Sequence, residues 1–211
     1  MKWADVLLRL LLPARDRDTI SGDLLEEYRE DILPAKGPFR ARLWYARQVL
    51  GFASPLNIGL AIGTVIGVLN LVDTAIEPLA DDTPGGMLLF ISPMLLAWFV
   101  VALSAVRRSG RFRDAVKTGI LVAAATMIVF HLAGIVRVNL FLDVIRDRDD
   151  WRNLLARFSQ SGFHSLRAYA NYEYVRGAPL IVLVGALAGA VSGAAGGAVG
   201  RAIGTSPSRS T

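Results

Sequence analysis

Four strongly polar residues lie within stretches of this sequence that are mostly apolar, and their spacing suggests chemistry. They are Asn70, Asp73, His131 and Arg137. A polar side chain is costly to place in hydrocarbon, so each of the four is a candidate functional residue. Counted from the ends that we assign to the cytoplasm, Asp73 and Arg137 reach the same depth, where an ion pair could join two helices. Asn70 and His131 come close in depth about one turn further in, where a hydrogen bond could form. We predict structural pairing, because a proton relay through His131 needs more groups than one aspartate supplies.

The motifs of known enzymes are missing from the sequence. It contains no HExxH, no GxSxG and no GxxxxGK[ST] phosphate loop, and it contains no cysteine. His164 and Ser165 are neighbours in the chain, whereas the members of a catalytic triad converge from separate elements. We therefore predict no catalysis, no cofactor and no metal site.

Four apolar stretches carry the polar residues. Their approximate bounds are 55–76, 87–106, 118–138 and 179–203. Each reaches the ~20 residues that a helix needs to cross ~30 Å of hydrocarbon. Composition agrees, since 53% of the residues are hydrophobic and the mean hydropathy is +0.44. The sequence predicts an all-α polytopic membrane protein, with a transmembrane domain of four helices in 53–205 and a disordered tail in 206–211.

The charges of the connections predict the orientation. The connection 77–86 has no lysine or arginine, whereas the connection 107–117 has four arginines and a lysine. Short basic connections stay in the cytoplasm, so the connection 107–117 is predicted there. With four spans, both chain ends lie on the same side as this connection and are therefore also predicted to be cytoplasmic. The net charge of +5 then reflects attraction to the anionic headgroups of a lipid bilayer rather than to nucleic acid.

The long connection 139–178 is extracytoplasmic by parity, although it carries several arginines. Within it, Asp149-Asp150 could cap a short amphipathic helix that ends at Gly162. The apolar stripe of that helix consists of Trp151, Leu154, Leu155 and Phe158. We expect this outer loop to lie at the lipid headgroups.

Two of the apolar stretches have glycines at four-residue intervals, which place them on one face of a helix. They are Gly59, Gly63 and Gly67 in the first stretch and Gly185, Gly189, Gly193 and Gly197 in the last. Small residues at this spacing let helix backbones approach closely in lipid. The pattern predicts that spans one and four pack together, or that one of them drives self-association as in a glycine zipper. We favour packing within the chain.

The first 52 residues form a separate region with three amphipathic stripes, separated by Pro13 and by the sequence PAKGP at 34–38. This pattern indicates a small cytoplasmic domain of three short helices. Its second helix is acidic and its third begins with arginines. The residues that we expect to contact a partner protein are Asp23, Glu26, Glu27, Tyr28, Trp44 and Tyr45.

Two runs in this region carry a family resemblance. They are SGDLLEEY at 21–28 and ARLWYARQVL at 41–50. Together they resemble the prefix domain that precedes some bacterial ABC permeases of the MacB/FtsX-like class. The resemblance implies a bacterial inner-membrane protein with a cytoplasmic docking module. The chain lacks room for the large extracytoplasmic domain of those permeases, so the resemblance does not imply transport.

These features favour an accessory or regulatory membrane protein whose N-terminal helices dock a partner protein. The alternative is a small transporter or channel subunit that works as a homo-oligomer. Such a subunit needs a polar path through the bundle, and the apolar stretches offer few polar residues for one.

Overall fold

The computed structural model describes residues 22–52, 54–80 and 82–204, and these ranges contain helices, turns and no strand. Within these ranges, four helices are long and apolar enough to cross a membrane. They are α4 (Pro55–Ile76), α5 (Pro84–Ser109), α6 (Phe112–Ile145) and α8 (Leu166–Gly204). Large apolar side chains such as Leu96, Leu183 and Val191 point outwards from them, as lipid-facing side chains do. The chain is an all-α multi-pass membrane protein, which confirms the predicted fold class.

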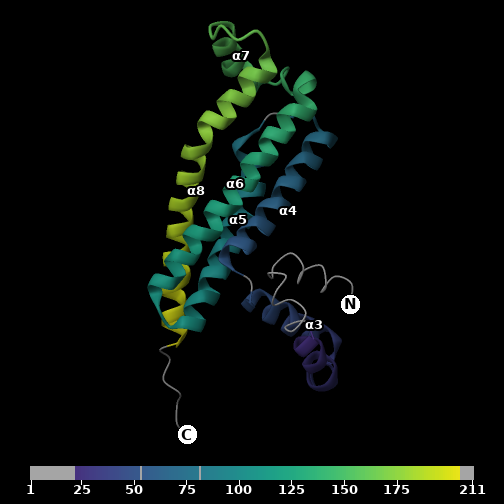
Figure 1. Cartoon of the computed structure of the whole chain (residues 1–211), viewed down its shortest axis with the longest axis vertical. Helices are drawn as coiled ribbons and strands as arrows, with labels where there is room; N and C mark the ends of the chain where they lie inside the picture. Colours follow the sequence, from purple (N-terminus) through teal and green to yellow (C-terminus); the bar gives the residue numbers. More distant parts are fainter. Residues whose placement is uncertain (1–21, 53, 81, 205–211) are drawn as a thin grey trace.

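The four helices run side by side and have two distinct ends (Figure 1). We call the end that holds Ser54, the α5–α6 turn at Gly110 and the C-terminal end of α8 the base. We call the opposite end, which holds the α4–α5 turn and α7 (Arg152–Ser159), the head. The predicted first helix, before Pro13, and the predicted tail at 206–211 lie outside the described residues.

Local signals explain where the helices begin and end. Ser54 caps α4, since its hydroxyl accepts a hydrogen bond from the Asn57 amide at 3.2 Å, and Pro55 follows at the first helical position. Thr83 caps α5 in the same way, accepting from the Gly86 amide at 3.1 Å. Gly110 ends α5 with φ of 69°, a conformation that favours glycine. The bounds predicted for the first span, 55–76, are those of α4.

The predicted outer loop at 139–178 is too long. Helix α6 continues to Ile145 and α8 already begins at Leu166, so only the residues between them connect the two helices. Pro179 lies inside α8 and does not begin it. A proline removes one helical hydrogen bond, but membrane helices tolerate this where neighbouring groups bond the backbone. The carbonyl that Pro179 leaves without a helical donor is that of Val175, and the neighbouring carbonyl of Tyr174 accepts a hydrogen bond from the His131 ring.

The predicted amphipathic helix is present at the head. A 3-10 turn, η2 (Asp149–Trp151), leads into α7, and Gly162 follows with φ of 73°. Trp151 is buried in an apolar cluster that also contains Val138 of α6 and Ala170 of α8. This contact fixes α7 over the head of the bundle.

The expected pairing of spans one and four is wrong, because both glycine faces pack against α6. A side chain at Gly63 would lie 2.6 Å from the carbonyl oxygen of Thr126, and one at Gly67 would lie 2.8 Å from Ala133. On the other side of α6, a side chain at Gly193 would lie 2.8 Å from the carbonyl oxygen of Ala115. The same holds for Gly59, Gly185, Gly189 and Gly197, whose nearest neighbours also belong to α6. Helix α6 is therefore the central helix, with α4 and α8 on either side of it.

The N-terminal region forms a helical hairpin that lies beyond the base, at the lower right of Figure 1. Residues 22–27 are helical and continue through a π-helical turn, η1 (Tyr28–Ile32), into α3 (Leu33–Phe52). The backbone turns sharply at Gly37, with φ of 73°, directly before Pro38. This agrees with the turn predicted at 34–38. We call residues 22–52 the N-terminal hairpin.

Candidate functional site

A cluster of two guanidinium groups around one carboxylate lies at the head. Arg137, on α6, is buried and donates from Nη1 and Nη2 to the two oxygens of Asp82, at 3.2 and 2.9 Å. Arg148, also buried, donates from Nη1 to Asp82 at 3.3 Å and from Nε to the carbonyl of Pro78 at 2.7 Å. A two-pronged contact between guanidinium and carboxylate is strong and directional. It ties the α4–α5 turn to the end of α6.

The predicted ion pair between Asp73 and Arg137 is wrong. After α4 ends at Ile76, the turn folds back over the bundle and brings Asp82 to the guanidinium. Asp73 stays exposed near this site. We expected Arg137 to have a carboxylate partner, and it has one, but counting along α4 could not show which acid the turn would deliver.

The sequence reasoning also missed Arg148. One signal could have identified it: the acidic connection 77–86 and the arginine-rich connection 139–178 lie at the same end by parity. Opposite charges on adjacent connections are expected to pair.

His131 and Asn70 are also not bonded to each other as predicted. The Nε2 of His131 lies 2.8 Å from the backbone carbonyl of Tyr174, and because a carbonyl only accepts, Nε2 is the donor. Its ring lies beside that of Tyr174, with centroids 5.4 Å apart. Asn70 is buried in α4, where its backbone carbonyl accepts from the Thr74 hydroxyl at 3.0 Å. Both side chains line the cavity described next.

A cavity of about 440 Å³ extends from this cluster into the head half of the bundle. Its volume is in the range of small-molecule sites, which is roughly 300–1,000 Å³. Its walls are mostly apolar side chains of α5, α6 and α8, whereas polar groups gather at the head. The polar lining residues are Asn70, Asp73, Asp82, Thr83, His131, Arg137, Arg148 and Tyr174.

Three helices meet at a buried polar group just below this cavity. The Trp98 indole on α5 donates to the Thr126 hydroxyl on α6 at 3.2 Å. That hydroxyl lies 3.1 Å from the Gly59 carbonyl on α4 and 2.8 Å from the Val122 carbonyl, so its single proton is shared between α4 and its own helix. No expectation from the sequence included this contact, because nothing in the pattern distinguishes Thr126 from other threonines.

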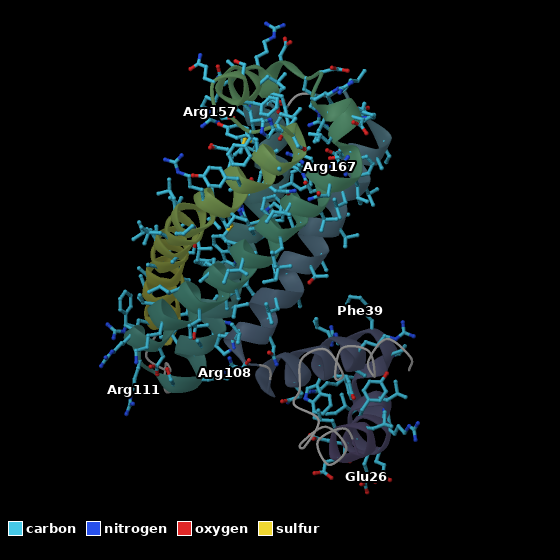
Figure 2. The ribbon with its side chains drawn as sticks, turned by 45° about the horizontal axis from the view of Figure 1, so that its top comes forward. Glu26, Phe39, Arg108, Arg111, Arg157 and Arg167 are labelled. Carbon is cyan, nitrogen blue, oxygen red and sulfur yellow. The ribbon has the colours of Figure 1, made fainter. Side chains whose placement is uncertain are left out.

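The residues expected to dock a partner divide into two groups. Asp23, Glu26 and Glu27 are exposed, and Figure 2 shows Glu26 pointing away from the bundle. Tyr28 and Tyr45 are instead buried in the hairpin, where their rings meet edge to face with centroids 5.7 Å apart.

These two tyrosines hold the N-terminal hairpin together, because their side chains fill the gap between its two helices. Their assignment to a docking surface is therefore wrong. Trp44 is half-buried.

Neither the chemistry of the described residues nor similarity identifies the protein further. Among residues 22–52, 54–80 and 82–204, no three histidine, aspartate or glutamate side chains are grouped so that they could hold a metal ion. The chain matches no family model, no curated protein and no solved structure. The resemblance of the N-terminal region to a permease prefix domain therefore stays a prediction.

Proposed function

We propose that the chain is a non-catalytic accessory protein of the bacterial inner membrane, whose N-terminal hairpin docks a cytoplasmic partner with a basic surface. The observation that carries the proposal is the construction of the hairpin. Leu24, Tyr28, Ala41 and Tyr45 are buried in it, and the rings of Tyr28 and Tyr45 meet edge to face. The acidic residues of its first helix stay exposed, and they are Asp23, Glu26, Glu27, Glu30 and Asp31.

Charge supports placing the hairpin in the cytoplasm. The hairpin lies on the base side, where Arg108 and Arg111 extend from the α5–α6 turn (Figure 2). Basic residues in short connections favour the cytoplasmic side. Arginines at the head pair with neighbouring acids, such as Arg148 with Asp82 and Arg157 with Glu173. Local pairing with acidic residues therefore explains why the head carries arginines although it is predicted to be extracytoplasmic.

An exposed acidic face favours a partner of opposite charge, because complementary potentials speed association and select the partner. The proposed relation to permease prefix domains fits this role, since such a domain would place a docking surface beside a membrane bundle. We expect the partner to be a protein that carries lysines and arginines on the contacted face.

Photo-crosslinking of the full-length protein in intact bacterial membranes tests this proposal. A photoreactive residue at Glu30 should form one dominant crosslinked product, and Glu26→Lys with Glu27→Lys should abolish it. As a matched control, Asp147→Lys reverses an exposed charge at the head and should leave the product unchanged. Products that survive the double reversal would contradict docking through the acidic face.

The cavity favours a second candidate function, a subunit of a small oligomeric transporter or channel. Two features count against it. The cavity reaches towards the base only as far as Trp98 and Ala188, and the glycines beyond pack tightly against α5 and α6. Both predicted glycine faces are also occupied within the chain. Ion or solute flux through liposomes that contain the purified protein would support this candidate, and we expect none above protein-free liposomes.

A further inference from the structure

An apolar cavity and a polar cavity meet at one buried arginine. The larger cavity, of about 440 Å³, is mainly apolar. A smaller one of about 240 Å³ lies on the α7 side and is lined by Asp150, Asn153 and Arg157, among others. Asp82, Arg137 and Tyr174 line both. A ligand that fills both cavities therefore needs an apolar part and a polar part joined near Arg137.

The length of the larger cavity is close to the thickness of the hydrocarbon in one leaflet of a bilayer. On α5, the lining residues run from Gly86 to Trp98, which is about 18 Å of helix at 1.5 Å per residue. Half of a hydrocarbon core of ~30 Å is about 15 Å. On α6, Arg137 follows Lys117 by about 30 Å of helix. With Lys117 at one boundary of the hydrocarbon, Arg137 lies at the other, where phosphates of the lipid headgroups are found.

The larger cavity opens on the flank of the bundle. Four of its lining residues, Ile91 and Leu95 on α5 and Ile181 and Val184 on α8, are between 37% and 56% exposed. Nearer the base the same two helices are in contact through Gly196, where a side chain would lie 2.9 Å from the carbonyl oxygen of Phe99. The two helices thus touch at the base and leave the cavity accessible from the side towards the head, where a lipid chain could enter.

The polar part of the site has a donor without an acceptor. Both Nη atoms of Arg137 bond Asp82, but its buried Nε has no hydrogen-bond partner. Such a donor is costly when it is left unsatisfied. A phosphate oxygen is a strong acceptor for a guanidinium, and Arg157 adds a second guanidinium to the smaller cavity. The carboxylates of Asp73 and Asp82 balance the charge of Arg137 and Arg148, which favours a phosphate diester over a free, fully charged anion.

We propose that the head half of the bundle binds one membrane phospholipid. An acyl chain occupies the larger cavity, a phosphate oxygen accepts a hydrogen bond from Arg137, and the rest of the headgroup lies in the smaller cavity beneath α7. This site is separate from the proposed docking function of the N-terminal hairpin, and neither depends on the other.

Native mass spectrometry of the full-length protein in detergent tests the site with three probes. Palmitoyl-oleoyl phosphatidylglycerol should bind as one molecule per chain. Palmitoyl-oleoyl glycerol, which has the chains without the phosphate, should bind at least roughly tenfold more weakly, since a charge-assisted bond is lost. Inorganic phosphate should not displace the phospholipid. Equal binding of the two lipids, or displacement by inorganic phosphate, would overturn the proposal.

Two pairs of variants distinguish a ligand site from a structural contact. Arg137→Gln should weaken phospholipid binding roughly tenfold, whereas Asp82→Asn should strengthen it, because it frees both guanidiniums for the phosphate. If the cluster only holds the fold, both variants will lower binding together. Ile91→Trp fills the larger cavity and should abolish binding. Leu96→Trp, on an exposed part of α5 outside the cavity, should not. Unchanged binding in Ile91→Trp would overturn the placement of the acyl chain.

Discussion

The base half and the head half of the same four helices are packed in different ways. Near the base, glycines of α8 press its backbone against α6 and α5, for example at Gly193 and Gly196. Near the head, the helices separate around a cavity, and ion pairs and amide contacts join them instead. In lipid, close backbone contact is the main source of attraction between helices. The comparison indicates that the base half supplies stability, which leaves room in the head half for the proposed phospholipid site.

The largest effect should come from filling the contact between α6 and α8. In Gly189→Leu the new side chain would meet Ala123 and the backbone of Gly119, which cannot rotate away. We expect a loss of about 3 kcal/mol or more in the free energy of unfolding, measured by thermal unfolding in detergent. Gly177→Leu is the matched control, because it lies on the same helix with nothing within 4 Å of the new carbon. Equal stability of the two variants would refute the importance of this contact.

A smaller loss is expected at the boundary between the two halves. Thr126→Val removes the hydroxyl that joins Trp98 and Gly59, leaving a buried indole N–H without an acceptor. This should cost about 1–3 kcal/mol in the free energy of unfolding. Thr64→Val is the control, because that exposed hydroxyl bonds only within α4, to the carbonyl of Leu60. If both variants unfold alike, the three-helix contact contributes nothing particular to the bundle.

The sequence predicted the base half better than the head half, and the reason is physical. Spans of ~20 apolar residues and glycines at four-residue spacing are periodic, so they indicate helices and close faces. Periodicity does not show which helix a close-packing face will contact, however. The packing of Gly59 against α6 therefore could not be predicted from it. At the head, Asp82 pairs with Arg137 only because the α4–α5 turn folds back over the bundle. Arg148, which follows the end of α6, pairs with the same carboxylate. No spacing rule along one helix contains that information.

The remaining two predictions concern the head half, where individual contacts should matter less. Asn139 on α6 and Asn171 on α8 exchange amide hydrogen bonds of 2.8 and 3.2 Å. A double-mutant cycle with alanine at both positions should give a coupling energy near 0.6 kcal/mol, and at most about 1.7 kcal/mol. Steric trapping in bicelles or denaturant unfolding would measure it. If this coupling energy exceeds the loss in the free energy of unfolding caused by Thr126→Val, the head, not the base, holds the bundle together.

The smallest effect is expected where α7 meets α8. Arg157 pairs with Glu173 at 2.9 Å, but its side chain is 59% exposed, so water and salt screen the pair. Arg157→Gln should change the free energy of unfolding by less than about 1 kcal/mol, and the difference should shrink at high salt. The same variant removes a guanidinium from the smaller cavity, so phospholipid binding should fall more than stability does. A stability loss that equals the loss in binding would show that α7 acts as a structural clamp, and the division between a stabilising base and a ligand-binding head would then fail.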